Sequence, residues 1–351
     1  MTQEAQPKDW FERITGFRED GYEATRARLV LEGETLVSLV NGSRHGTGRL
    51  ELCTLQSLRD RLNPAPGGGL RTTVRCLAGD ARALHSAPEF AGSLFQVASQ
   101  FNLLEMVSPN VTPEDGVTRY VHDRTQGPAC AIAAGAATIF RNYFVPVAGE
   151  QGQTATRQVD ALAPLGETLS SMLGRPVHSL WTMRNGYALC TPDGLAAIGK
   201  LLREVPADSM DRLRGKLAIG LHHDVDVTDA SGPDRPRVSQ AFCSALPVSY
   251  TRIAPPAWEP FARLVLEAAY EATLLAAVER HRQGRSPTVL LTRLGGGAFG
   301  NDDRWIDDAI LRALGLVEFS GLDVRLVSFG NVHASFSAIE QRWSDSEPGR
   351  R

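Results

Sequence analysis

Short apolar runs alternate with longer amphipathic segments through the second half of the chain. Residues 287–292 and 323–329 are apolar runs of strand length, whereas 259–284 has helical spacing and ends at Gly284. Strands that alternate with helices favour a three-layer α/β fold, with a mixed central sheet flanked by helices.

The same patterns predict the remaining elements. Strands are expected on both sides of a turn at Gly33, in a hairpin that turns at Asn185 and Gly186, and over 94–98, 216–228 and 237–250. Helices are expected over 129–144, 168–174, 193–205 with Asp193 as its cap, 303–314 and 335–343. Loops rich in Gly, Pro or polar residues are expected over 41–49, 63–71 and 107–128. The chain is therefore divided into an N-terminal α/β extension, 1–85, that packs on a core domain, 86–345.

Composition excludes several classes of protein. The 351 residues are 42% hydrophobic and 22% charged with a formal net charge of -3, which is typical of a soluble globular protein. No basic block suggests a nucleic-acid partner, and no apolar run is long enough to span a membrane. The N-terminus has no signal-peptide pattern, and the cysteines are scattered without a CxxC pair. A reduced, cytoplasmic protein is expected.

A glycine-rich stretch follows the predicted strand 287–292. Glycines between a strand and a helix let the backbone approach an anion and point N–H groups at it. The P-loop pattern fails because no Lys follows Gly300. The dinucleotide pattern GxGxxG matches at Gly295, Gly297 and Gly300, but it lies near the C-terminus rather than in an early βαβ unit. The alternative interpretation is a tight turn.

Beyond this pattern, "LTRLGGGAFGNDDRWIDDAILRAL" followed by "VRLVSFG" resembles the C-terminal part of a macrodomain. The resemblance implies a macrodomain-like fold and places one segment around a diphosphate: Gly295, Gly296, Gly297, Ala298, Phe299, Gly300 and Asn301. It also places Phe329, at the end of the last strand, near the distal ribose or adenine.

Upstream, "FQVASQFNLLEM" resembles the macrodomain strand that delivers an Asn to the ribose beside the scissile bond, with Asn102 at the matching position. The segment "TPEDGVTRYVHDRTQGPA" is most similar to ADP-ribosyl hydrolases related to poly(ADP-ribose) glycohydrolase, in the branch that includes a bacterial effector acting on ADP-ribosylated ubiquitin. The sequence departs from the glycohydrolases in lacking consecutive glycines and Gln-Glu-Glu in the catalytic loop, and no Pro follows Asn301. Under this resemblance, 86–345 is an ADP-ribose-binding catalytic domain.

The acidic loop 107–128 carries the candidate chemistry. Cleavage at a ribose C1″ builds oxocarbenium character, which a carboxylate stabilises while an acid protonates the leaving group. Glu114, Asp115 and Asp123 are the candidate catalytic residues, with Glu105 nearby. The alternative is that Pro113 to Gly116 forms a solvated turn. The residues at the start of the following helix are candidates for ribose or phosphate binding: Thr125, Gln126 and Gly127.

Two further acidic groups permit a metal interpretation. Carboxylates after the glycine stretch suit either a helix cap or Mg²⁺ held through water: Asp302, Asp303, Asp307 and Asp308. His222, Asp224 and Asp226 share one face of an ideal strand, as metal ligands do, although a polar strand face near the ligand pocket is the alternative. The aromatic residues expected in the core are Trp181, Tyr187 and Trp258.

The sequence thus predicts an ADP-ribosyl hydrolase whose partners are ADP-ribose and an ADP-ribosylated protein. The predicted enzyme requires no resident cofactor, although a bound Mg²⁺ is left as an open alternative. Three alternatives remain at this point: a non-catalytic ADP-ribose reader, a metal-dependent phosphoesterase that uses the His222 group and the acidic cluster, and a structural or partner-binding module.

Overall fold

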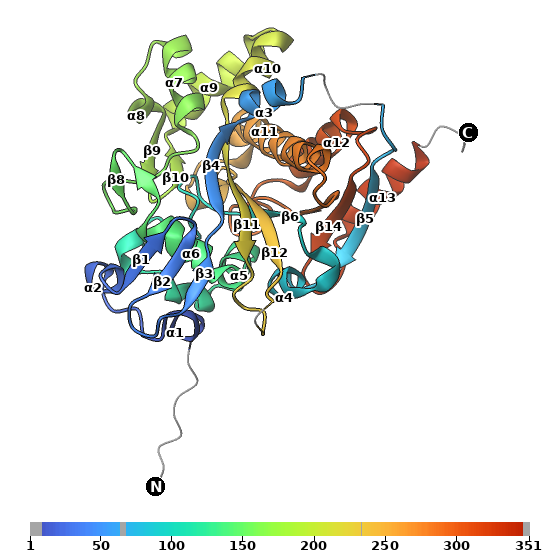
Figure 1. Ribbon diagram of the computed structural model, residues 1–351. Coiled ribbons are helices and arrows are strands. Elements are labelled where there is room, and N and C mark those ends of the chain that lie inside the picture. Colours follow the sequence, from blue (N-terminus) through green and yellow to red (C-terminus); the bar gives the residue numbers. More distant parts are fainter. Residues whose placement is uncertain (1–8, 64–67, 233, 347–351) are drawn as a thin grey trace.

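A mixed seven-stranded sheet forms the centre of the protein in a computed structural model that describes residues 9–63, 68–232 and 234–346 (Figure 1). Its strands lie in the order β4 (Arg49–Thr54), β11 (Ala218–Asp226), β12 (Arg237–Cys243), β6 (Leu94–Ala98), β13 (Thr288–Leu291), β14 (Asp323–Ser328) and β5 (Thr73–Ala78). The last five strands run parallel, whereas β4 and β11 pair antiparallel. The predicted α/β class with a mixed central sheet is confirmed.

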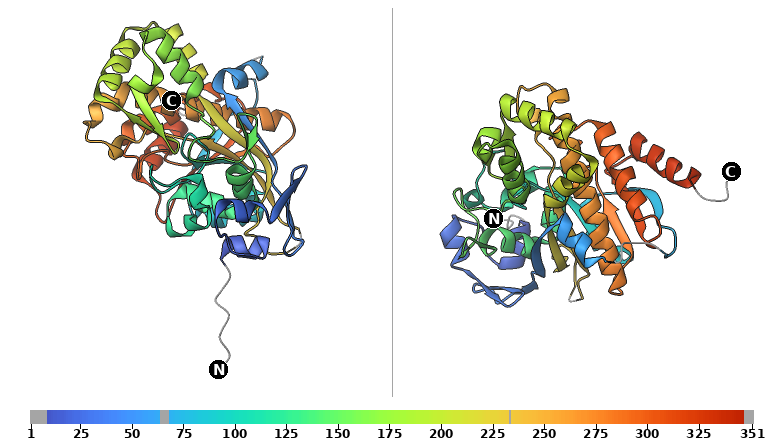
Figure 2. Two further views of the ribbon diagram at one scale, coloured as in Figure 1. Left: turned by 90° about the vertical axis from the view of Figure 1, so that its left-hand side faces the viewer. Right: turned by 90° about the horizontal axis from the view of Figure 1, so that it is seen from above.

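Helices cover both faces of this sheet (Figures 1 and 2). Successive residues of β13 alternate between the two: Val289 and Leu291 pack in the large core with α11 (Pro255–Arg282), while Leu290 packs with Ala134 and Ala137 on the opposite face. The first face also carries α3 (Leu55–Arg61), α9 (Pro192–Glu204), α10 (Ala207–Lys216) and α12 (Asp303–Leu316). The second face carries α4 (Ala81–Ser86), α5 (Gln126–Ala133) and α6 (Gly135–Tyr143).

Smaller elements surround the central layers. The N-terminal part forms α1 (Trp10–Thr15), α2 (Tyr22–Arg26), β1 (Leu29–Glu32), β2 (Thr35–Ser38) and β3 (Arg44–Gly46). The others are β7 (Pro146–Val147), β8 (Glu150–Gln151), α7 (Ala163–Leu173), α8 (Val177–Leu180), β9 (Trp181–Arg184), β10 (Tyr187–Cys190), α13 (Ala334–Asp345) and the 3₁₀ turns Pro88–Phe90, Pro113–Asp115, Thr118–His122 and Val248–Tyr250. No described helix combines the length and the apolar character that crossing a membrane requires.

Most predicted elements are present, including the turn at Asn185 and Gly186, but the helix over 129–144 is two helices. The helical ladder breaks at Ala134 (φ -111°, ψ 57°), where the Gly135 N–H bonds to the Thr228 hydroxyl at 2.8 Å. A Cβ at position 135 would lie 2.7 Å from the Trp10 ring, so glycine permits this contact.

Three other predictions differ from the structure. Thr191, not Asp193, caps α9, because its hydroxyl accepts the Gly194 N–H at 2.9 Å. The strand over 237–250 ends at Cys243, and the loop over 41–49 contains β3 and the start of β4. Strands β4 and β5, both inside the predicted extension 1–85, form the two edges of the central sheet. The boundary at residue 85 stays a prediction, and residues 64–67 of the loop 63–71 lie outside the described part.

Candidate active site

Five parallel strands end at one edge of the sheet, and the segments that follow them line two adjoining cavities. These segments begin at Ser99 after β6, Ser244 after β12, Thr292 after β13, Phe329 after β14 and Gly79 after β5. The first cavity has a volume of about 560 Å³ and the second about 320 Å³. The carboxyl ends of parallel strands are where open α/β folds bind ligands, so we term the two cavities together the cleft.

The glycine loop lies between β13 and α12, and its fold depends on Gly295 and Asn301. Gly295 has φ +74°, and a Cβ there would meet the Ala245 side chain at 2.4 Å. Asn301 closes the loop: its backbone N–H and its side-chain amide both donate to the Gly295 carbonyl, at 2.9 and 3.3 Å. Asn301 is thus buried in a structural role, and Gly296, Gly300 and Asn301 do not line the cleft.

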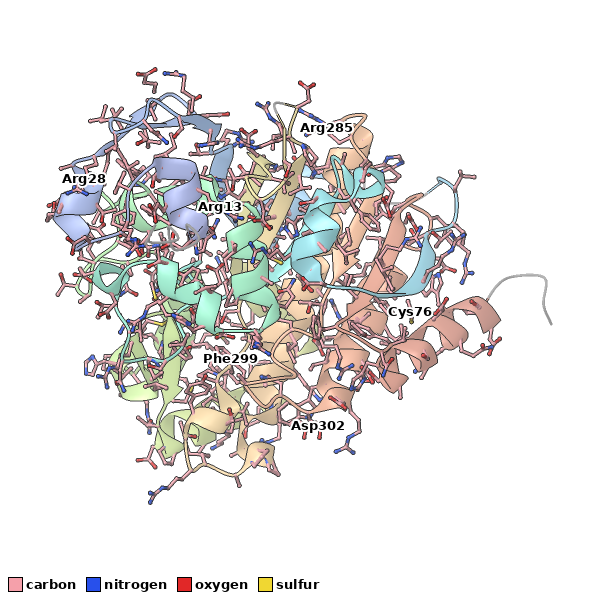
Figure 3. The ribbon with its side chains drawn as sticks, turned by 90° about the horizontal axis from the view of Figure 1, so that it is seen from below. Arg13, Arg28, Cys76, Arg285, Phe299 and Asp302 are labelled. Atoms are coloured by element: carbon pink, nitrogen blue, oxygen red, sulfur yellow. The ribbon has the colours of Figure 1, made fainter. Side chains whose placement is uncertain are left out.

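The part of the loop that faces the cleft offers free donors. Gly297, Ala298 and Phe299 line the second cavity, and a Cβ at Gly297 would meet no atom within 4 Å (Figure 3 labels Phe299 and Asp302). Within the described residues, no acceptor is bonded to the backbone N–H groups of these three residues. Consecutive unpaired N–H groups in such a loop form an anion-binding concavity.

The segment before α5 forms another wall. Asp123, Thr125 and Gln126 line both cavities. The Gln126 amide accepts the Ala98 N–H at 2.9 Å and donates to the Gln96 carbonyl at 2.8 Å, so it fixes the helix to β6. Gly127 permits this close approach, because a Cβ there would lie 2.0 Å from the Ala98 oxygen. Gln126 and Gly127 thus position the wall, whereas Thr125 is exposed and lines the cleft.

The predicted catalytic carboxylates do not come together. Asp123 lies in the cleft with one oxygen bonded to the Thr125 N–H at 2.8 Å. Glu114 and Asp115 lie outside it: Glu114 accepts the Ala155 N–H at 2.9 Å, and Asp115 accepts the Thr112 N–H at 2.8 Å in a capping box. The alternative interpretation, a turn, describes this segment.

Asn102 also lies outside the cleft. Its side chain is fully buried, donating to Gln158 at 3.0 Å and accepting the Leu104 N–H at 3.1 Å. Phe329, in contrast, lines both cavities and is 80% exposed, so its ring is free to stack on a ligand.

Glu105 is the carboxyl that the structure adds to the site. It lines the second cavity although its side chain is buried, and its Oε2 has no hydrogen-bond partner among the described residues. Burial raises the pKa of Glu105 to about 7, while Arg141, at 3.4 Å from Oε1, opposes that rise. A carboxyl with a pKa near neutrality is suited to proton transfer.

A fully buried arginine lies behind Glu105. Arg141 donates to the Leu103 carbonyl at 3.0 Å and to the Thr138 hydroxyl at 3.1 Å, and its guanidinium lies 3.9 Å from the centre of the Phe242 ring. Burial lowers the pKa of Arg141 and outweighs the opposite effect of Glu105. Burial therefore disfavours charge on both partners of this pair.

Tyr187 is a further cleft residue that the sequence did not indicate. It is buried, as are Trp181 and Trp258, but it also lines the second cavity beside Tyr250 and Phe299. Its hydroxyl donates to the Met106 carbonyl at 2.6 Å and so anchors the loop that carries Glu105.

Neither predicted metal group converges. Asp302 caps α12, Asp303 and Asp307 pair with Arg293 at 2.5 and 3.0 Å, and Asp308 pairs with Arg263 at 2.9 Å. No set of three His, Cys, Asp or Glu side chains in the described part of the chain is arranged to hold a metal ion.

The prediction that His222, Asp224 and Asp226 share one strand face is wrong. A β-bulge shifts the register between His222 and Val225, so Val225 takes the face of His222 and Asp226 points to the other face. Asp224 has φ +53° and pairs with Arg285 at 3.2 Å.

Comparison with known proteins gives distant structural likenesses. No family model matches the sequence, and no curated protein matches it. The poly(ADP-ribose) glycohydrolase of Thermomonospora curvata is 13% identical with a TM-score of 0.46, covering 88% of this chain and 93% of that chain. The Deinococcus radiodurans enzyme in complex with ADP-ribose is 13% identical with a TM-score of 0.45, covering 85% and 94%.

Proposed function

We propose that this protein binds ADP-ribose in the cleft and hydrolyses the bond between its ribose C1″ and a modified protein. One observation carries the proposal: the unpaired N–H groups of the glycine loop share a cavity with the buried carboxyl of Glu105. The first suits an anionic ligand, and the second suits proton transfer beside it. The resemblance of the glycine loop to the diphosphate loop of macrodomains agrees with an anionic ligand at this place.

The diphosphate accounts for the glycine loop. Its oxygens would accept from the N–H groups of Gly297, Ala298 and Phe299, while the start of α5 and the Thr125 hydroxyl offer further donors. The exposed ring of Phe329 provides a stacking face for adenine. The proposed substrate is a class: any protein side chain joined to the ribose C1″ through a glycosidic bond.

Glu105 supplies the chemistry in this proposal. Its protonated carboxyl donates to the leaving atom as the bond from C1″ breaks, and the target side chain is released. A water oxygen then bonds to C1″, and its proton returns to the Glu105 carboxylate. Asp123, which lines the same cavity, stabilises the positive charge that develops on the ribose. The products are the unmodified protein and free ADP-ribose.

Calorimetric titration with ADP-ribose tests the ligand, with and without Mg²⁺. Gly297→Glu puts a negative charge where the diphosphate would lie, and Gly315→Glu is the matched control, since a Cβ at either position meets no atom within 4 Å. Binding lost only in Gly297→Glu supports the proposal, and no binding by the wild type in either condition overturns it.

Release of ADP-ribose from an ADP-ribosylated protein then separates the hydrolase from the reader. Wild-type protein that binds ADP-ribose but releases none from Arg-, Glu- or Ser-linked substrates is a reader, and the catalytic part of the proposal fails. Release that depends on Glu105 supports it.

A further inference from the structure

Within the described part of the chain three arginines line the cleft, and two of them are paired with carboxylates. Arg82 forms two hydrogen bonds to Asp229, at 2.6 and 2.8 Å. Arg293 is held by Asp303 and Asp307. An arginine engaged in this way would have to exchange one anion for another in order to bind a ligand, so neither offers its charge freely.

Arg124 differs from both. It lines the first and the second cavity, its side chain is exposed, and no carboxylate in the described parts of the chain pairs with it. Its guanidinium carries a positive charge and presents parallel N–H donors that match phosphate oxygens.

The backbone at Arg124 is fixed even though the side chain is free. Asp123 accepts the Thr125 N–H at 2.8 Å and donates its own N–H to the Tyr120 carbonyl at 3.1 Å. On the other side, Gln126 is bonded to β6. The arginine therefore emerges from a rigid base between the two cavities, which lowers the entropic cost of ordering it on a ligand.

The local charges require a cation here. Asp80 and Asp123 line the first cavity, and both would repel a diphosphate. We propose that Arg124 is the cation that clamps the diphosphate against the N–H groups of the glycine loop. This inference rests on the proposed function and assigns it a residue that sets affinity for the phosphates and not for the nucleoside.

Titration of Arg124→Ala tests the clamp, with Arg119→Ala as its matched control. Arg119 lies in the preceding 3₁₀ turn, pairs with Asp115 at 3.6 Å and does not line the cleft. ADP-ribose should bind Arg124→Ala about tenfold more weakly or worse, since charge-assisted hydrogen bonds are strong. Arg119→Ala should bind like the wild type, and Arg124→Lys should lie between because it keeps the charge without the bidentate geometry.

Two further readouts distinguish a clamp from a structural role. The gap between wild type and Arg124→Ala should narrow as salt is raised from 0.05 to 0.5 M, because screening weakens an exposed charge (roughly a threefold shorter Debye length). Adenosine, which has no phosphate, should bind both proteins equally well in competition with a fluorescent ADP-ribose analogue.

The outcomes separate this inference from the proposed function. Wild-type affinity for ADP-ribose in Arg124→Ala overturns the clamp while the proposed function stands, and so does an equal loss of adenosine binding. Failure of the wild type to bind ADP-ribose overturns both.

Discussion

Replacing Glu105 by Gln tests the chemistry of the cleft most directly. The substitution keeps the shape of the side chain and removes its ionisable proton. Glu105 is 2% exposed, one of its oxygens is unpartnered among the described residues, and the other lies 3.4 Å from Arg141. The variant should therefore fold while losing the group that protonates the leaving atom.

The raised pKa of Glu105 predicts how much stability the wild type should lose with rising pH relative to Glu105→Gln. Burial raises the pKa of Glu105 from 4.5 to about 7, so between these values the folded protein holds a proton that the unfolded chain has released. This group's contribution to stability is therefore full below pH 4.5 and is lost as pH rises to about 7. One pKa unit corresponds to about 1.4 kcal/mol, so the wild type should lose up to about 3 kcal/mol across this window relative to Glu105→Gln.

The comparison uses slopes because the variant also leaves the buried Arg141 without its carboxylate, which lowers stability at every pH. Urea unfolding at pH 5 and pH 8 measures the slope for wild type, Glu105→Gln and Glu114→Gln, the last being the same change at an exposed site outside the cleft. Release of ADP-ribose should fall about 100-fold or more in Glu105→Gln alone. Parallel pH–stability curves together with undiminished release would refute the reasoning.

The remaining predictions concern the loops. Asp123→Asn should lower the release of ADP-ribose at least about tenfold in an activity assay. Asp115→Asn should leave release unchanged, but urea titration should show a loss of stability of about 1 kcal/mol because the capping box is weakened. Gly295→Ala should destabilise by about 2 kcal/mol, because φ is +74° and its Cβ would overlap Ala245, and a lowered urea midpoint checks this. Glu19→Gln should speed amide hydrogen exchange in the acidic loop, because Glu19 accepts three donors from residues 117 and 118.

Two strands in the centre of the sheet were predictable because most of their side chains are apolar, with Gln96 as a polar exception in β6. Strand β13 and strand β6 are read directly from Val289–Leu291 and Leu94–Ala98. The edge strands β4 and β5 were missed because polar and exposed residues interrupt them, as in Arg49–Thr54. The helix break at Ala134 depends on Thr228, which is distant in sequence, so no local pattern marks it.

The site divides in the same way. The glycine loop was found because close backbone approach leaves a local signature of glycines, and Phe329 was placed by the resemblance to macrodomains. The direction of a loop carboxylate, in contrast, depends on how the loop closes. Leu103 takes φ +62°, and the Gln100 side chain accepts the Met106 N–H at 2.7 Å, which folds the segment back and places Glu105 in the cleft. An acidic residue inside the apolar run Leu103–Met106 was the available signal for a buried carboxyl.

Glu19, in the N-terminal part of the chain, holds the acidic loop in place although it does not line the cleft. Glu19 binds the N–H groups of Val117 and Thr118 at 2.9 and 2.8 Å and accepts the Tyr143 hydroxyl at 2.6 Å, so it ties the acidic loop to α6. The same loop continues into Tyr120, whose hydroxyl accepts the Glu105 N–H at 3.2 Å. Both carboxyl groups of the proposed reaction, those of Glu105 and Asp123, are held by this connected segment. Their positions therefore depend on contacts between residues far apart in the sequence, such as Glu19 and Val117, which are separated by 98 residues.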